Sequence, residues 1–381
     1  MKFPFFSLSI LSIFIFSLMM VGCSDEPNAV GIGLLPNTDF PSIDSTESFI
    51  TSSSSYLARL SGASTTLLLG RYQNTIEART LLQFSNIPTD RSHAIIDSAI
   101  LKLRITYRFK DSTGTLALNI HKLLRSWSEN SFTWDSIDAS LTNSLPDTIF
   151  STFINPQDSI VQIRIDSIVR EWFQSTESTP NGIMISPTNV SNIVIGISTV
   201  IISGVDYRPE LIIGYHDSSD TASISIRPQQ RTFVANLLDS PPLGIITVQA
   251  GVAMRGMMTF DISLIPSTAS ITDASMELEL DTNNSLNNSF TNRSLIAHMV
   301  LDSSSPPRLS GITAIGTPND TNRTVFIFDM KNIVQQWATG KQNYGIVLRA
   351  YNEFTSLDRF AILSSTSSMR PKLKVTYTLL P

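Results

Sequence analysis

One stretch of this sequence occurs twice, and this duplication constrains the fold more than any other feature. The first copy runs from Val161 to Trp172 and the second from Phe326 to Trp337, and they align without a gap. In each copy apolar residues first alternate with polar ones, although Ile327 blurs the alternation in copy two, as in a half-buried strand. They then recur four residues apart, as on one face of a short helix. A strand that leads directly into a short helix is therefore predicted at both places.

The boundary between the two periods differs between the copies. Asp166 stands there in copy one and is predicted to be the helix N-cap, whereas Lys331 holds the place in copy two and is a poor cap. Trp172 and Trp337 each share a helical face with an isoleucine. Both are therefore predicted to be buried core residues rather than platforms for sugar rings.

Further anchors repeat in the same order on both sides of this unit, which makes chance an unsatisfactory explanation. They pair 79–84 with 255–260, 87–88 with 265–266, 96–99 with 271–274, 116–121 with 295–298, and 208–215 with 370–377. The period of roughly 170 residues is too long for a solenoid. Two similar domains are therefore expected, spanning residues 46–216 and 222–381.

The coarse pattern predicts an all-β protein. Many short strands with turn signals, and almost no long helical pattern, indicate two tandem antiparallel jelly-roll β-sandwich domains. Charged residues make up only 15% of the chain, which suits a Ser- and Thr-rich extracytoplasmic protein better than a cytosolic enzyme. The net charge of −5 argues against nucleic acid as a partner.

The N-terminus predicts membrane attachment. Residues 1–22 form a signal segment that is first basic and then apolar, and Cys23, the only cysteine, follows it directly. Met20 to Cys23 resembles a bacterial lipobox, which implies that Cys23 carries lipid; a transmembrane anchor and an ordinary cleavage site are the alternatives. The proline-containing segment 23–45 reads as a flexible tether.

The residues after the cysteine indicate a location. Ser24 does not signal inner-membrane retention, and Asp25-Glu26 resembles the acidic tether of surface-exposed lipoproteins in some Gram-negative bacteria. We expect a lipid-anchored protein of the outer membrane, on its periplasmic face or on the cell surface.

The order of motifs in copy one resembles the DNRLRE domain. The motifs are Arg79 to Phe84, Ile87-Pro88, Ile96 to Leu103, Trp127 to Trp134, Val169 to Trp172, Asn181 to Ile183 and Arg208 to Leu211. The resemblance covers nearly all of 46–216 and, more loosely, 222–381; copy two lacks the tryptophan motif, and neither copy spells out the hexapeptide that names the family. It implies a jelly roll on secreted or surface proteins, some members of which bind carbohydrate, including alginate.

Two sets of residues are candidates for ligand contact. Trp127, Glu129 and Trp134 could offer an aromatic face with a nearby polar group to a sugar, or could cover one end of the sandwich. The second set is a basic row of alternate residues along one predicted strand, formed by Lys102, Arg104, Arg108 and Lys110.

The equivalent row of copy two has the opposite charge and consists of Glu277, Glu279 and Asp281. One hypothesis is that the basic row binds an acidic polysaccharide, because cations at about 7 Å spacing suit repeating uronate carboxylates. Alternatively, the two rows dock the domains together, or both are solvated strand faces.

No catalytic set stands out. The four histidines are far apart, and phosphate loops, zinc-protease motifs and nucleophile elbows are missing from the sequence. We expect a non-catalytic surface lipoprotein without cofactors that binds carbohydrate, with acidic polysaccharide as one ligand class; a structural calcium stays open. The alternative function is a structural or adhesive envelope protein that binds other proteins through exposed edge strands.

Overall fold

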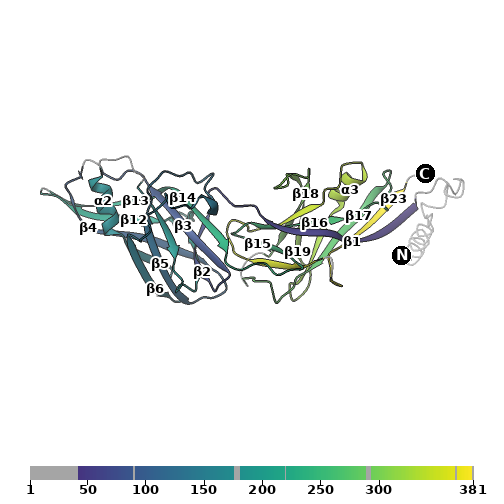
Figure 1. Cartoon of the computed structure of the whole chain (residues 1–381), viewed down its shortest axis with the longest axis horizontal. Helices are drawn as coiled ribbons and strands as arrows, with labels where there is room; N and C mark the ends of the chain where they lie inside the picture. Colours follow the sequence, from purple (N-terminus) through teal and green to yellow (C-terminus); the bar gives the residue numbers. More distant parts are fainter. Residues whose placement is uncertain are drawn as a thin grey trace, which may run out of the picture.

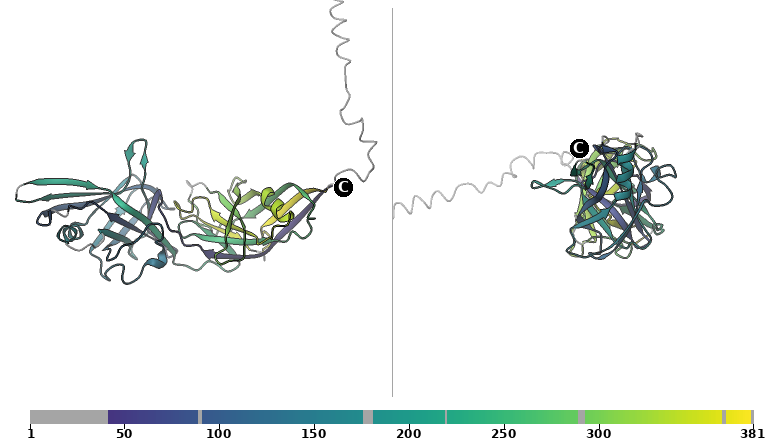
Figure 2. Two further views of the ribbon diagram at one scale, coloured as in Figure 1. Left: turned by 90° about the horizontal axis from the view of Figure 1, so that it is seen from above. Right: turned by 90° about the vertical axis from the view of Figure 1, so that its left-hand side faces the viewer.

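The computed structural model describes residues 42–88, 91–175, 181–218, 220–288, 293–364 and 367–379. The chain is nearly all β, with 52% strand and 6% helix, so the predicted all-β class is confirmed. Two domains lie end to end in an elongated molecule (Figures 1 and 2). In the described part of the chain, no helix has both the length and the apolar character needed to cross a membrane.

The N-terminal domain is a curled antiparallel sheet with one helix. Its elements are β2 (Thr66–Tyr72), β3 (Ile76–Phe84), β4 (Ile95–Arg108), β5 (Gly114–Lys122), β6 (Thr148–Ile154), β7 (Ile160–Arg164), α2 (Asp166–Gln174), β8 (Gly182–Pro187), β9 (Val194–Ser198), β12 (Glu210–His216), β13 (Thr221–Ile226) and β14 (Pro228–Leu237). A separate hairpin, β10 (Ile201–Ile202) and β11 (Val205–Asp206), and a 3₁₀ turn at Trp134–Ser136 also belong to this domain.

The C-terminal domain contains the first strand of the chain. Its elements are β1 (Ser42–Leu57), β15 (Ile245–Gln249), β16 (Met254–Phe260), β17 (Ser270–Glu279), β18 (Leu295–Val300), β19 (Leu309–Pro318), β20 (Val325–Asp329), α3 (Lys331–Ala338), β21 (Ile346–Ala350), β22 (Arg359–Leu363) and β23 (Lys372–Leu379). Eight of these strands close on themselves in the order β1-β23-β17-β20-β19-β18-β21-β16 and back to β1, with β15 and β22 attached beyond β16.

The duplication seen in the sequence is also present in the pairing. In the N-terminal domain, β13 and β14 together take the place of β1, because β13 pairs with β12 while β14 pairs with β3. The order then continues through β4 to β7 on one side and through β8 and β5 to β6 on the other. One difference between the copies is that β19 pairs with β20, whereas their equivalents β6 and β7 are not paired in the described structure.

The two domains exchange their first strands. The first half of β1 pairs with β23 and its second half with β16, so residues 42–57 belong to the C-terminal domain. Figure 1 shows this purple strand among the green and yellow strands, in the other domain from β2 and β3, which follow it in sequence. Conversely, residues 221–237 complete the N-terminal domain. These pairings change the boundaries expected from the sequence, which assigned each segment to the domain that follows it and extended the tether to residue 45.

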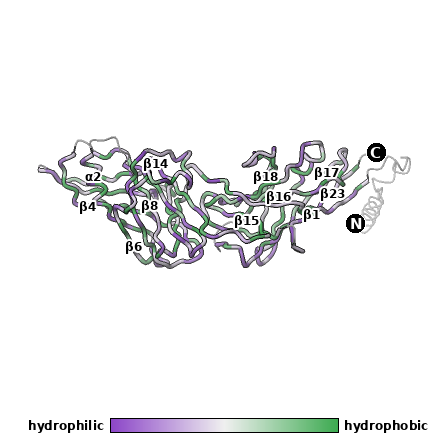
Figure 3. Tube along the Cα trace, viewed as in Figure 1, coloured by the Kyte–Doolittle hydropathy of each residue, from purple (hydrophilic) through white to green (hydrophobic). Residues whose placement is uncertain are grey.

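Apolar alternation builds a separate core in each domain, and Figure 3 shows hydrophobic and hydrophilic residues alternating along the strands. Trp172 lies in the first core and Trp337 in the second, and both are buried, as predicted. Trp172 also contacts Phe84, with the ring centroids 5.9 Å apart. Burying each large apolar side chain stabilises the fold by roughly 1.5–3 kcal/mol.

The predicted strand–helix unit is confirmed in both domains, as β7 with α2 and β20 with α3. The predicted N-cap is wrong. Ile165 occupies the cap position of α2, and Asp166 is the first helical residue. The Asp166 carboxylate accepts hydrogen bonds from the Ala99 amide at 2.6 Å and from Arg164 Nε at 3.0 Å. Its place is set by these contacts with β4 and β7 rather than by capping.

Candidate cationic site at the domain junction

A loop of the C-terminal domain is inserted into the end of the N-terminal domain. Leu357, between β21 and β22, is fully buried and belongs to the N-terminal core. Its amide donates a hydrogen bond to the Tyr107 hydroxyl at 3.4 Å. Nearby, Asn288 Nδ2 donates to the Arg108 carbonyl at 2.5 Å. Apolar burial and hydrogen bonding together hold the two domains in one arrangement.

A hollow of about 400 Å³ opens beside this junction. Its lining comes from the N-terminal domain except for Asn288, and consists of Thr106, Tyr107, Arg108, Lys110, Asp111, Ser112, Pro156 and Asn288. Arg108 Nη2 donates to the carbonyls of Asn155 and Asp158, so this guanidinium holds the turn between β6 and β7. The hollow contains one carboxylate, Asp111, which partly balances its positive charge.

A second hollow of about 180 Å³ adjoins the first and shares Lys110 with it. It is lined by Lys110, Leu280, Thr282, Ser285, Asn287, Arg293, Asn322, Arg323 and Thr324. Three of these residues are cations, and none is a carboxylate. Because the three cations come from three different loops, only the docked domains bring them together. We refer to Lys110, Arg293 and Arg323 as the cationic hollow.

The polar groups that line the cationic hollow are only partly engaged, since the Ser285 hydroxyl accepts from the Ala361 amide and the Thr324 hydroxyl donates to Asp320. Lys110 Nζ lies 3.5 Å from the Asn287 carbonyl, and Lys110 and Arg323 are exposed. Arg293 Nε and Asn287 Oδ1 are buried atoms without a hydrogen-bond partner in the described structure. Cations beside an anionic oxygen form charge-assisted hydrogen bonds, and neutral amides and hydroxyls bind sugar hydroxyls. The arrangement therefore suits an acidic, hydroxyl-rich ligand.

The basic row predicted from the sequence is divided between two places. Strand β4 pairs with β7 up to Arg104 and with β9 from Ile105 onward, with a register shift after Ile105. Lys102 lies opposite Glu210 on β12, and the Arg104 guanidinium covers the Tyr207 ring at 5.4 Å. Arg108 and Lys110 lie instead at the domain junction. The expectation of one continuous row is therefore corrected, because β4 passes from one part of the sheet to another.

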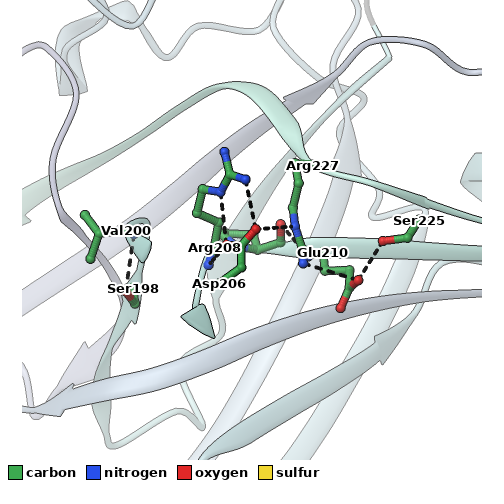
Figure 4. A network of polar contacts seen from close by, with 8 residues as sticks. Ser198, Val200, Asp206, Arg208, Glu210, Ser225 and Arg227 are labelled. Carbon is green, nitrogen blue, oxygen red and sulfur yellow. Dashed lines mark hydrogen bonds and ion pairs between the residues drawn. The ribbon is translucent and has the colours of Figure 1, made fainter. Parts of the chain in front are cut away.

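Lys102 and Arg104 adjoin an ion-pair network that Figure 4 shows from close by. Asp206 accepts hydrogen bonds from Arg208 Nε at 3.0 Å and from Arg227 Nε at 3.2 Å. The hydrogen bond from Arg208 contributes most, and the charge of Arg227 adds to it, so that the pKa of Asp206 lies well below its usual range. Burial alone would raise the pKa of Glu210, but the Ser225 hydroxyl and Arg227 hold it below its ordinary value. The two carboxylates of this face are thus paired with Arg208 and Arg227, while Lys102 and Arg104 remain as a smaller basic pair outside the cationic hollow.

The two oppositely charged rows do not dock the domains. Glu277 forms an ion pair with Lys372 on the neighbouring strand, at 3.1 Å. Glu279 lines a hollow of about 350 Å³ within the C-terminal domain, together with Glu277 and Lys372. The Asp281 carboxylate accepts from Asn283 and Asn284 in its own loop. The alternative that these rows dock the domains is therefore corrected, because Glu277 and Asp281 bind partners within the C-terminal domain and Glu279 lines a hollow of that same domain.

The tryptophan motif covers the outer face of a sheet. Trp127 is only 7% exposed and forms a small core with residues of β3, β8 and β14. Glu129 Oε2 accepts from the Arg231 amide at 3.1 Å, and the Arg79 guanidinium lies 4.7 Å from the Trp134 ring. The hypothesis that Trp127 is a sugar platform is therefore corrected, because its ring is covered, while Glu129 and Trp134 have partners within the fold.

The remaining titratable residues are dispersed. His216 pairs with Asp97, while Asp135 and Asp138 pair with two different arginines. Among the described residues, no group of three or more His, Cys, Asp and Glu could hold a metal ion. Cys23 and the acidic pair at 25–26 lie outside the described residues.

Sequence reasoning missed Arg293 and Arg323. Both lie in polar loops where no periodicity marks them. The duplication could have pointed to Arg293. This residue lies between β17 and β18, and Lys110 lies between the equivalent strands β4 and β5. A basic residue thus occurs in both copies of this loop.

Comparison with known proteins adds no family assignment: no family model matches the chain, and no curated protein shows significant similarity to it.

Proposed function

We propose that this protein is a non-catalytic, lipid-anchored envelope protein that binds an acidic polysaccharide in the cationic hollow. The supporting observation is that Lys110, Arg293 and Arg323 converge on a hollow whose described lining residues include no carboxylate. Anchoring through Cys23 at the outer membrane, on its periplasmic face or at the cell surface, is part of the same proposal.

The chemistry favours a polymer of uronate or sulfated sugars over a neutral glycan. Carboxylate or sulfate oxygens would accept charge-assisted bonds from Lys110 and the two arginines, while sugar hydroxyls would bind Asn287 and Asn322. Both hollows open toward solvent and share Lys110, so a chain longer than one sugar could contact both. Binding of this kind weakens as salt screens the charges.

Affinity electrophoresis tests the proposal with soluble protein spanning residues 24–381, in gels containing alginate, pectin or a neutral glucan. Acidic polymers are expected to retard the protein, and Lys110→Glu to abolish most of the retardation. Lys102→Glu is the matched control, because it makes the same charge change within β4, at a residue that does not line the hollow. An equal loss in both variants, or no retardation by any acidic polymer, would overturn the proposed site.

Lipid attachment has its own test. Metabolic labelling of the full chain with radioactive palmitate should label the native protein, and Cys23→Ser should remove the label. An unlabelled native protein would exclude the anchor while leaving the polysaccharide site to be judged by electrophoresis.

A further inference from the structure

The N-terminal domain has a free strand edge at a position where the C-terminal domain has none. In the C-terminal domain, β19 pairs with β20 through Gly316 and Phe328, among other residues. The equivalent strand β6 pairs only with β5 in the described structure. The other edge of β6 therefore presents backbone donors and acceptors without a strand partner.

This edge also lacks the devices that usually protect exposed edges. Natural edge strands carry charges, prolines or bulges that prevent pairing with another chain. β6 reads Thr-Ile-Phe-Ser-Thr-Phe-Ile, without a charge or a proline, and its Ile149 and Phe153 are 73% and 56% exposed. By contrast, β14 begins with Pro228 and contains Arg231, while the exposed residues of β13 are small and polar.

The sequence of β6 is complementary to itself. If two copies pair antiparallel about Ser151, Ile149 of one lies opposite Phe153 of the other, and the same contact recurs on the far side of the two-fold axis. Both apolar pairs then lie on the outer face, where directly opposite side chains contact each other. The inner positions place Phe150 opposite Thr152 in the same register. No like charges meet.

We propose that β6 is a self-association surface through which two copies of this chain pair antiparallel about Ser151. A seven-residue strand is about 24 Å long, so the interface is smaller than that of a standard stable complex. The dimer is accordingly weak and concentration-dependent. It is independent of the cationic hollow, which is formed by other loops.

Sedimentation velocity tests the proposal on residues 24–381, which include every described strand. Over about 1–500 μM the protein should pass from monomer toward dimer, and Phe153→Lys should weaken the dimer at least tenfold. Ile315→Lys is the matched control, because Ile315 is 53% exposed on the equivalent strand β19, whose edges are both paired. A monomer throughout, or equal effects of the two variants, would overturn the proposal.

Cross-linking tests the register separately. Residues 24–381 contain no cysteine, so Ser151→Cys supplies a single thiol per chain. In the proposed register the two introduced thiols lie directly opposite each other, at a Cα separation of about 4.5–5.5 Å that a disulfide can bridge. Ile149→Cys places its thiol opposite Phe153 instead and should cross-link at least fivefold less. Comparable cross-linking of both variants would exclude this register.

Discussion

The backbone amide of Leu357 donates a hydrogen bond to the hydroxyl of Tyr107 across the boundary between the two domains. The Leu357 side chain is fully buried in the N-terminal core, although the residue belongs to a loop of the C-terminal domain. Burial at this boundary also raises the pKa of Tyr107. The junction is therefore part of the folded core, and the hollows beside it depend on that packing.

Truncating this side chain should destabilise the whole molecule. Leu357→Ala removes a fully buried leucine and should lower the free energy of unfolding by about 2–5 kcal/mol. Urea denaturation measures the change. Leu243→Ala is the matched control, because Leu243 is 100% exposed and its truncation should cost less than about 0.5 kcal/mol. A similarly small effect of Leu357→Ala would show that the junction opens in solution.

The strand exchange makes an unusual prediction about deletion of the N-terminus. Removing residues 24–57 should increase hydrogen exchange in β16 and β23, because β1 pairs with both of these strands. The equivalent strands of the N-terminal domain, β3 and β12, should keep their protection, since they pair with β14 and β13. Hydrogen exchange followed by mass spectrometry measures the protection of peptides from each domain separately.

Two further variants make this deletion interpretable. Removing only residues 24–41 should leave the protection of β16 and β23 unchanged, because these two strands pair with β1, which this shorter deletion keeps. Ile50→Ala should reproduce part of the effect by truncating a buried side chain of β1 within the C-terminal core. Loss of protection in β3 and β12 instead would mean that each segment pairs with the domain adjacent to it in sequence.

Asp206 should stabilise the fold at neutral pH. Its depressed pKa means that the folded state favours the carboxylate, so its contribution is present above the unfolded pKa of about 3.9 and is lost as the pH falls through the lower folded pKa. Asp206→Asn should cost about 1–3 kcal/mol at about pH 7, because two arginines lose a shared acceptor. Urea denaturation at about pH 7 and pH 2 should show the difference shrinking in acid. A difference that is independent of pH would contradict the assignment.

His298 should make the protein sensitive to mild acid. Its Nε2 accepts a hydrogen bond from Arg349 Nε at 3.0 Å, and burial lowers its pKa. The folded state therefore binds this proton less readily than the unfolded chain, so stability falls as the pH drops below the unfolded pKa of about 6.5. Thermal unfolding between about pH 7.5 and pH 5 measures the loss.

The histidine responsible is identified by substitution. His298→Gln should reduce the acid sensitivity, because glutamine offers an acceptor without titrating. His121→Gln is the companion variant, since burial lowers the pKa of His121 as well. An unchanged pH profile in the His298 variant would assign the effect elsewhere.

The sequence by itself determined the duplication, the strand–helix unit and the burial of Trp172 and Trp337. These features are encoded by residues near one another in the chain, where a period of two or of 3.6 decides which side chains share a face. The same reasoning correctly gave an all-β protein.

Only the tertiary structure decided which first strand completes which domain and which cations meet. Segments 42–57 and 221–237 occupy equivalent positions in two similar sheets, so local patterns cannot choose between the two possible pairings. Lys110 meets Arg293 and Arg323 because Leu357 and its loop dock one domain on the other. Such long-range contacts depend on the packing of complete domains, and periodicity within a short segment contains no information about them.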